Sequence, residues 1–132
     1  MLIPATRYRD CEAALAFLTV VLGLTPFAVY RDDDGRILHA QMALGAGMMM
    51  FGPPHDGAFD GFMAAPADAG GVTATIYGIV QDVAGLHDRV SGAGAEIVMP
   101  LAEQPYGGSS FSVRDPEGHI WTFGDYDPMG GA

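Results

Sequence analysis

The side chains that could hold a metal ion or transfer a proton are few in this sequence and lie far apart. Cys11 is the only cysteine, so neither an internal disulfide nor a cysteine cluster can form. A metal ion usually needs three or four converging ligands, most often imidazole, thiolate or carboxylate. The four histidines do not show metal-ligand spacing, because we expect them in a strand, a loop, a helix and a turn: His39, His55, His87 and His119. We therefore expect no cofactor and no metal site.

Three other side chains are candidates for binding a ligand. Arg7 lies between apolar residues and would be costly to bury alone, so it pairs either with an acid such as Asp10 or with an anionic or carbonyl group of a ligand. His39 has apolar neighbours, which suit a hydrogen-bonded histidine in the core or in a binding cleft. Tyr106 lies in a glycine-containing loop and either closes over a ligand or folds onto the second helix.

The elements that position these residues occur twice along the chain. Asp10 and Phe51 are separated by 41 positions, and so are Asp82 and Phe123, which places the second copy 72 positions after the first. Each aspartate precedes an apolar segment of helical length and is an expected N-cap. Glycine follows each segment, as is common where a helix ends.

Each copy therefore predicts a β-α-β-β-β order of elements. The first comprises strands Ile3–Tyr8, Phe27–Tyr30, Ile37–Leu44 and Met48–Phe51 around a helix over Ala13–Leu22. The second comprises strands Val72–Val80, Glu96–Met99, Ser110–Arg114 and His119–Phe123 around a helix over Val83–Val90, with a loop over Pro100–Gly108. The expected organisation is one domain, 1–132, made of a first unit 1–52, a linker or flap 53–71 and a second unit 72–127.

Several motifs within this pattern resemble the vicinal oxygen chelate superfamily, which includes glyoxalases, bleomycin resistance proteins and dioxygenases. The resemblance covers about residues 2–127. It implies an α+β fold in which the two βαβββ units form a curved, eight-stranded mixed sheet with a cleft. The motifs that carry it are Gly94-Ala95-Glu96, Pro105-Tyr106-Gly107-Gly108 and Asp115-Pro116-Glu117-Gly118-His119.

Metal-dependent members of the superfamily bind one divalent cation through the first and last strands of each unit. The resemblance places those four positions at Ile3, Met50, Thr75 and Thr122. None of these side chains is a good ligand for a divalent cation, and shifting the alignment by one residue supplies none either. The resemblance therefore implies a metal-free member.

Strand alternation indicates what faces the cleft instead. If Ile3 and Thr75 point into it, then Arg7 and Tyr77 do so as well, and Met48 and Met50 join them. Alternating methionines are also common as ordinary core residues. We predict no catalytic residue and the following ligand-binding residues: Arg7, His39, Met48, Met50, Thr75, Tyr77, Tyr106 and Thr122.

The charge of the chain restricts its partners. Sixteen acidic residues and six arginines, with no lysine, give a net charge of -10, which repels nucleic acid. This charge suits a cationic ligand, or it serves only solubility. No apolar run of 18 residues is present, so we expect no membrane association and a cytoplasmic location.

Three functions fit these observations. The first is a metal-independent protein that binds a small hydrophobic or cationic aromatic ligand, similar to antibiotic-sequestering bleomycin resistance proteins and, like them, a homodimer. The second is a glyoxalase- or dioxygenase-like enzyme, either with a divalent metal on non-standard ligands or metal-free and acting through Arg7, Tyr106 and His39. The third is a structural or regulatory module, which would fill the cleft with its own side chains.

Overall fold

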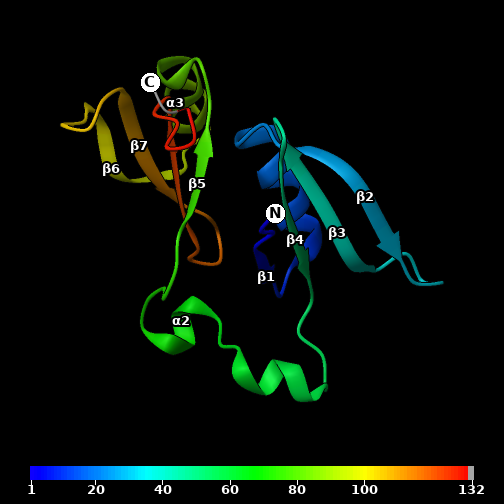
Figure 1. Ribbon diagram of the computed structural model, residues 1–132. Helices are drawn as coiled ribbons and strands as arrows, with labels where there is room; N and C mark the ends of the chain where they lie inside the picture. The colour runs from blue at the N-terminus through cyan, green and yellow to red at the C-terminus, as the bar shows by residue number, and fades with distance from the viewer. Residues whose placement is uncertain (131–132) are drawn as a thin grey trace. The chain divides into compact units, whose positions relative to one another are not determined.

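The computed structural model describes residues 1–130 and divides the chain into two compact units, Met1–Gly71 and a second that begins at Val72 (Figure 1). Each unit contains one four-stranded mixed sheet. The eight expected strands are thus present, and each sheet uses only strands of its own unit. The α+β class with two βαβββ units is confirmed.

Unit 1 follows the predicted order of elements. Its strands form the sheet order β1-β4-β3-β2, in which β1 is parallel to β4 and the other pairs are antiparallel. The helix α1 continues directly into a turn of π-helix, η1, and the unit ends with two short helices after its last strand. The elements are β1 (Ala5–Arg7), α1 (Cys11–Ala16), η1 (Phe17–Val21), β2 (Thr25–Arg31), β3 (Ile37–Leu44), β4 (Gly47–Gly52), η2 (Ala58–Phe62) and α2 (Pro66–Ala69).

Unit 2 repeats the same topology, with sheet order β5-β8-β7-β6 and a parallel pair at the corresponding place. Its elements are β5 (Ile76–Ile79), α3 (Val83–Gly92), β6 (Glu96–Glu103), β7 (Ser109–Arg114) and β8 (Ile120–Gly124). The predicted offset of 72 positions holds for the parallel pairs: Ala5 is opposite Met50 in unit 1, and Tyr77 is opposite Thr122 in unit 2. The internal repeat is confirmed at the level of strand register.

The predicted helix ends are confirmed in both units. The Asp10 carboxylate accepts the Ala13 N–H at 3.0 Å, and the Asp82 carboxylate accepts the Gly85 N–H at 3.0 Å. Gly23 and Gly94 follow the helical segments with φ of 82° and 80°, a left-handed conformation that glycine adopts without steric cost. These signals could be read from the sequence because capping depends on local geometry.

The core of unit 1 forms between the helical segment and one face of the sheet. Buried side chains in β3 and β4 alternate with half-buried ones, as the strand period requires. Tyr8 contacts Phe51 edge-to-face at 5.2 Å between ring centroids. The helical segment packs one side against this sheet, and these of its residues are buried: Cys11, Ala14, Leu18 and Leu22.

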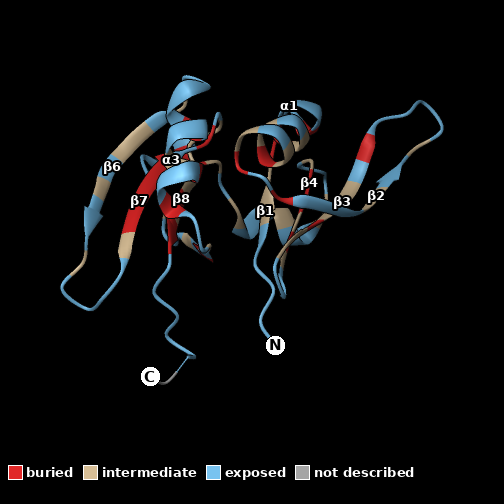
Figure 2. Cartoon of the chain, turned by 90° about the horizontal axis from the view of Figure 1, so that it is seen from above, coloured by how far each residue is buried: buried red, intermediate tan, exposed pale blue. Residues whose placement is uncertain are grey.

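The core of unit 2 is aromatic, and its buried residues concentrate in β7 and β8 (Figure 2). Trp121 stacks on Phe123 at 6.2 Å, and Phe123 contacts Phe111 at 5.9 Å. Trp121 is 2% exposed, and its Nε1 donates to the buried carboxylate of Asp115 at 3.1 Å. Trp121 is thus a core residue. Its ring nitrogen is satisfied by the aspartate that begins the Asp-Pro-Glu-Gly turn.

The expected linker 53–71 contains two short helices, η2 and α2. Three expected strand boundaries were wrong. The first strand of each unit is shorter than predicted, so Ile3 and Thr75 precede their strands. The expected loop from Pro100 instead continues β6 as far as Glu103. A proline fits there because β6 is an edge strand with two register shifts, and an edge strand can leave N–H positions unpaired.

Within residues 1–130, no helix is long and apolar enough to cross a membrane.

One buried polar atom gives a direct stability test. In the described part of the chain, the Thr6 hydroxyl oxygen is buried without a hydrogen-bond partner. An unsatisfied buried hydroxyl is destabilising, and valine keeps the β-branched shape without it. We expect Thr6→Val to raise the free energy of unfolding by about 1 kcal/mol, measured by chemical denaturation. A loss of stability would mean that the hydroxyl is hydrated in solution.

Candidate functional site

Each sheet has a face that does not contribute to the helix-packed core, which we call its second face. In unit 1 the cross-strand register joins Ala5, Met50 and Gln41 in one row, and Met48 lies opposite Ala43 in the next. Met48, Met50 and Gln41 are half-buried, whereas the intervening Met49 is 3% exposed. The predicted alternation is therefore observed, and the methionines at 48 and 50 are not core residues of their unit.

His39 lies on the same second face of unit 1. It is half-buried and opposite the exposed Tyr30, with 6.0 Å between the ring centroids. Its Nε2 lies 3.4 Å from the side-chain nitrogen of Gln41, two residues along the strand. Of the two settings predicted for His39, the structure places it outside the helix-packed core.

Arg7, also on this face, is held by an acid from a distant part of the sequence. Its Nη2 donates to Asp60 Oδ1 at 2.9 Å and its Nε to Oδ2 at 3.2 Å, a bidentate pair with η2. The two side chains are only 23% and 13% exposed. The Phe59 ring centroid lies 6.0 Å from the guanidinium carbon. Asp60 was not predicted as a partner, because a contact across 53 positions leaves no local pattern.

Asp60 organises the segment between β4 and η2. It accepts the His55 N–H at 3.0 Å, and the His55 ring lies 3.4 Å from its other oxygen. Hydrogen bonds from Arg7 and from the His55 backbone lower the pKa of Asp60 from 3.8 to about 2. The segment that the sequence predicted to be a linker or flap is therefore tied to β1.

The ion pair between Arg7 and Asp60 predicts that the stability of the protein depends on pH. Because folding lowers the pKa of Asp60, its contribution to stability is full above pH 3.8 and is lost as the pH falls through about 2. Asp60→Asn should remove the charge and accelerate amide hydrogen exchange over residues 55–62 at neutral pH. Asp56→Asn, at an exposed neighbouring carboxylate, is the matched control. Equal exchange in wild type and Asp60→Asn would show that the ion pair does not hold the segment.

The second face of unit 2 carries mainly hydroxyl groups, with Met99 of β6 opposite Ser112. Tyr77, Thr122 and Ser112 form one cross-strand row. The Thr122 and Ser112 hydroxyls are hydrogen-bonded at 2.7 Å. Thr75 is exposed and lies just before β5. Of the predicted residues in this unit, Tyr77 and Thr122 are thus directly adjacent.

Tyr77 and Tyr106 share a neighbour that the sequence analysis missed. The Tyr77 hydroxyl donates to the Tyr126 carbonyl oxygen at 2.7 Å, and the Tyr106 and Tyr126 rings are 5.0 Å apart. Burial, followed by the proximity of Tyr106 and Asp125, raises the pKa of Tyr77. Tyr106 thus packs on Tyr126, and its closing over a ligand stays a prediction. Tyr126 gave no signal, because it follows the last strand without a recognisable motif.

The four positions at which metal-dependent relatives hold their cation do not fit a metal ion here. Ile3 has no donor atom, and Met50 offers only a thioether beside Ala5 and Gln41. The Thr122 hydroxyl is already engaged with Ser112. No group of three histidine, cysteine, aspartate or glutamate side chains within residues 1–130 is arranged to hold an ion. We therefore assign no chemical step to a metal.

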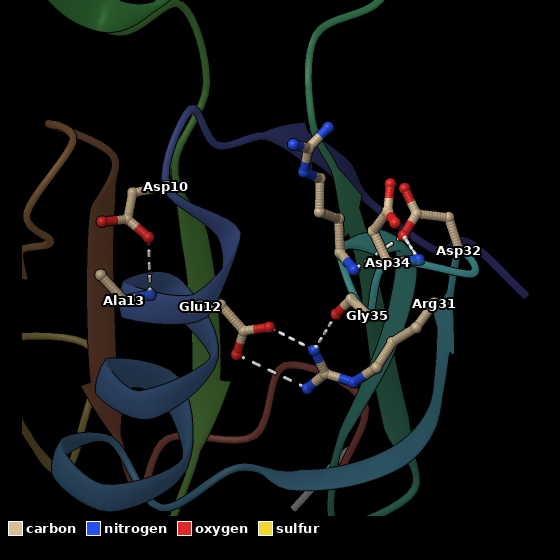
Figure 3. A network of polar contacts seen from close by, with 8 residues as sticks. Asp10, Glu12, Ala13, Arg31, Asp32, Asp34 and Gly35 are labelled. Atoms are coloured by element: carbon tan, nitrogen blue, oxygen red, sulfur yellow. Dashed lines mark hydrogen bonds and ion pairs between the residues drawn. The ribbon is translucent and has the colours of Figure 1, made fainter.

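The acidic turn after β2 also has a structural role. Asp32 accepts the N–H groups of Asp34 and Arg36, both at 2.9 Å, which stabilises a turn. Arg31 donates to the Gly35 carbonyl at 2.8 Å and pairs with Glu12 of α1 (Figure 3). Glu12 and the turn carbonyl thus hold this arginine at the periphery of unit 1.

The family model described as Glyoxalase/Bleomycin resistance protein/Dioxygenase superfamily matches residues 4–123. With the two βαβββ units and their register, this match shows that the chain belongs to that superfamily. It is 32% identical over 109 residues to uncharacterised proteins of Mycobacterium bovis and Mycobacterium tuberculosis, a match that covers 83% of this chain. The chain spans 68% and 61% of the lengths of these two relatives.

Solved structures share the fold. TioX from Micromonospora sp. ML1 is 28% identical with a TM-score of 0.74, and the match covers 94% of each chain. The fosfomycin resistance protein FosX from Listeria monocytogenes has a TM-score of 0.69 at 13% identity, covering 97% of this chain and 93% of its own. The second likeness concerns the fold alone.

Proposed function

We propose that this protein binds a small molecule without a metal ion, in the manner of the antibiotic-sequestering members of its superfamily. One observation carries the proposal. Met50 and Thr122 lie at equivalent points on the second faces of the two sheets, and the superfamily resemblance assigns both positions to metal ligands. A thioether and a hydrogen-bonded hydroxyl suit contact with a ligand better than coordination of a cation.

The composition of the second faces supports a ligand with a hydrophobic or aromatic body. Met48 and Met50 are flexible and polarisable, and both are half-buried. His39 and Tyr30 add neighbouring rings to the same face. A few polar groups among apolar side chains are typical of small-molecule sites.

The electrostatics favour a cationic aromatic ligand over an anionic one. The net charge is -10, and Arg7, the cation on the second face of unit 1, is paired with Asp60. An anionic ligand would have to compete with that bidentate carboxylate. A cation would instead be attracted by the field of the whole protein.

We also propose that the protein acts as a homodimer in the cytoplasm. Large apolar side chains on β2 and β3 of unit 1 support self-association, since Phe27 and Leu38 are 70% and 55% exposed. The helical segment contributes less, because its apolar face is mostly buried within unit 1, leaving Val20 at 72% exposed. Sedimentation equilibrium of the full chain measures this state directly.

A dye titration tests the binding function. The planar cationic dye proflavine should bind saturably to the full chain, and Met50→Ala should weaken binding about fivefold, because roughly 1 kcal/mol of apolar contact is lost. Val20→Ala, which truncates an exposed apolar side chain of η1, should leave the affinity unchanged. Fluorescence anisotropy measures both. Absence of saturable binding, or equal weakening by the two variants, would contradict the proposal.

Metal titration of the same protein distinguishes a metal-independent binding protein from a metalloenzyme. Calorimetric titration with nickel, zinc, manganese and iron(II) should show no tight site, and a chelator should leave dye binding unchanged. His39→Ala is the informative variant, because His39 is the imidazole on the second face of unit 1. Tight one-to-one metal binding that this variant abolishes would favour the alternative of a lyase or oxidoreductase with non-standard ligands.

A further inference from the structure

We propose that Tyr77, Tyr106 and Tyr126, together with the carboxylates of Asp125 and Asp127, form a cage for an organic ammonium group. This inference rests on the proposed small-molecule binding function and specifies the chemical class of the ligand. It places the charged end of such a ligand at the end of β8. Tyr126, Asp125 and Asp127 were not among the residues predicted to bind.

The three tyrosines present several ring surfaces within a short distance. The Tyr106 and Tyr126 rings are 5.0 Å apart and inclined at 64°, so their faces point in different directions. The Tyr77 hydroxyl donates to the Tyr126 backbone carbonyl at 2.7 Å, which places the hydroxyl end of the third tyrosine beside Tyr126. All three side chains remain accessible, with exposures of 37%, 56% and 39% in sequence order.

The tyrosines are held on a fixed scaffold. In the turn that carries Tyr106, the Gln104 N–H donates to the Gly108 carbonyl at 2.9 Å, and the Gln104 side chain donates to the Ser110 hydroxyl at 3.0 Å. Tyr77 lies directly over Gly124, where a Cβ atom would come within 2.7 Å of the tyrosine oxygen. A larger residue at 124 would displace the ring. The cage geometry is thus set before any ligand binds, which lowers the entropic cost of binding.

Asp125 and Asp127 flank Tyr126 in the sequence, and backbone N–H groups hold both carboxylates. Asp125 accepts the Ser109 N–H at 2.8 Å, and Asp127 accepts the Met129 N–H at 2.8 Å. Both lie close enough to Tyr77 to raise the pKa of its hydroxyl. Between residues 72 and 132 the sequence has eight acidic residues and only two arginines. The surroundings of the cage therefore attract positive charge.

An organic ammonium ion fits this chemistry better than a metal ion. Aromatic faces stabilise a cation through the ring quadrupole, and quaternary ammonium groups are recognised in this way because they are weakly hydrated. A divalent metal would need more oxygen ligands, and these residues form no metal-binding group. A neutral ligand of the same shape would gain contact with the rings but nothing from the carboxylates.

Choline and its neutral carbon isostere, 3,3-dimethyl-1-butanol, provide the test with the full chain. Amide NMR titration at constant ionic strength should show saturable choline shifts centred on Gly107, Gly108 and Tyr126. The isostere should bind at least about fivefold more weakly, as expected when one cation–π contribution is lost. Tyr106→Leu and Asp125→Asn should each weaken choline binding by a similar factor. The asparagine keeps an oxygen that can accept the Ser109 N–H.

Phe62→Leu and Asp33→Asn, exposed positions in unit 1, are the matched controls and should leave the choline affinity unchanged. Equal affinity for choline and the isostere, or the absence of saturable shifts at these amides, would overturn the cage. If a cage variant fails to fold, the affinities of the wild-type protein for choline and for the neutral isostere still test the cage. Proflavine binding that persists without choline binding would overturn this inference alone, whereas loss of both would overturn the proposed function as well.

Discussion

The parallel pairing of the first and last strands in each unit is the constraint on which the rest of the structure depends. It places Ala5 opposite Met50 and Tyr77 opposite Thr122. Because side chains alternate along a strand, a shift of one residue in either pair would exchange the helix-packed face for the second face. Buried Phe51 and Trp121, each next to one of these residues, make such a shift costly. The residues proposed to meet a ligand are thus positioned by residues that never contact it.

Side-chain contacts outside the sheets position the segments that the strand register does not. The Arg7–Asp60 pair joins η2 to β1, and the hydrogen bond between Trp121 and Asp115 joins the last turn to the core of unit 2. The two differ in energetic character. The Trp121 bond satisfies a buried donor that would otherwise be destabilising, whereas the Arg7 pair is partly exposed and is weakened by protonation of Asp60 at low pH. The Trp121–Asp115 hydrogen bond thus stabilises the fold, whereas the Arg7–Asp60 pair determines how much positive charge lies on the second face of unit 1.

Local rules account for what the sequence predicted well. Asp10, Asp82, Gly23 and Gly94 marked the helix ends because caps and left-handed glycines act over a few residues, and the 72-residue repeat supplied the topology. Strand parity also placed Met48, Met50 and Tyr77 on their second faces. The sequence could not reveal Asp60 or Tyr126, since their contacts join positions 53 and 49 residues apart. Gln41 could have been found, because it lies two residues from His39 on the same strand.

The two copies show how one scaffold can carry different chemistry. Their strand order and parallel register are equivalent, yet the second face of unit 1 carries two methionines, an imidazole and a paired guanidinium, while that of unit 2 carries phenols and hydroxyls with one methionine. This divergence is possible because stability resides mainly in the helix-packed faces, where Leu18 and Trp121 are buried. Substitution on a second face therefore changes recognition at little cost to folding. A metal centre that takes ligands from both copies is sensitive to such substitutions, because losing one ligand from either copy weakens the whole site. Ligand-binding surfaces that lie within one copy can evolve separately.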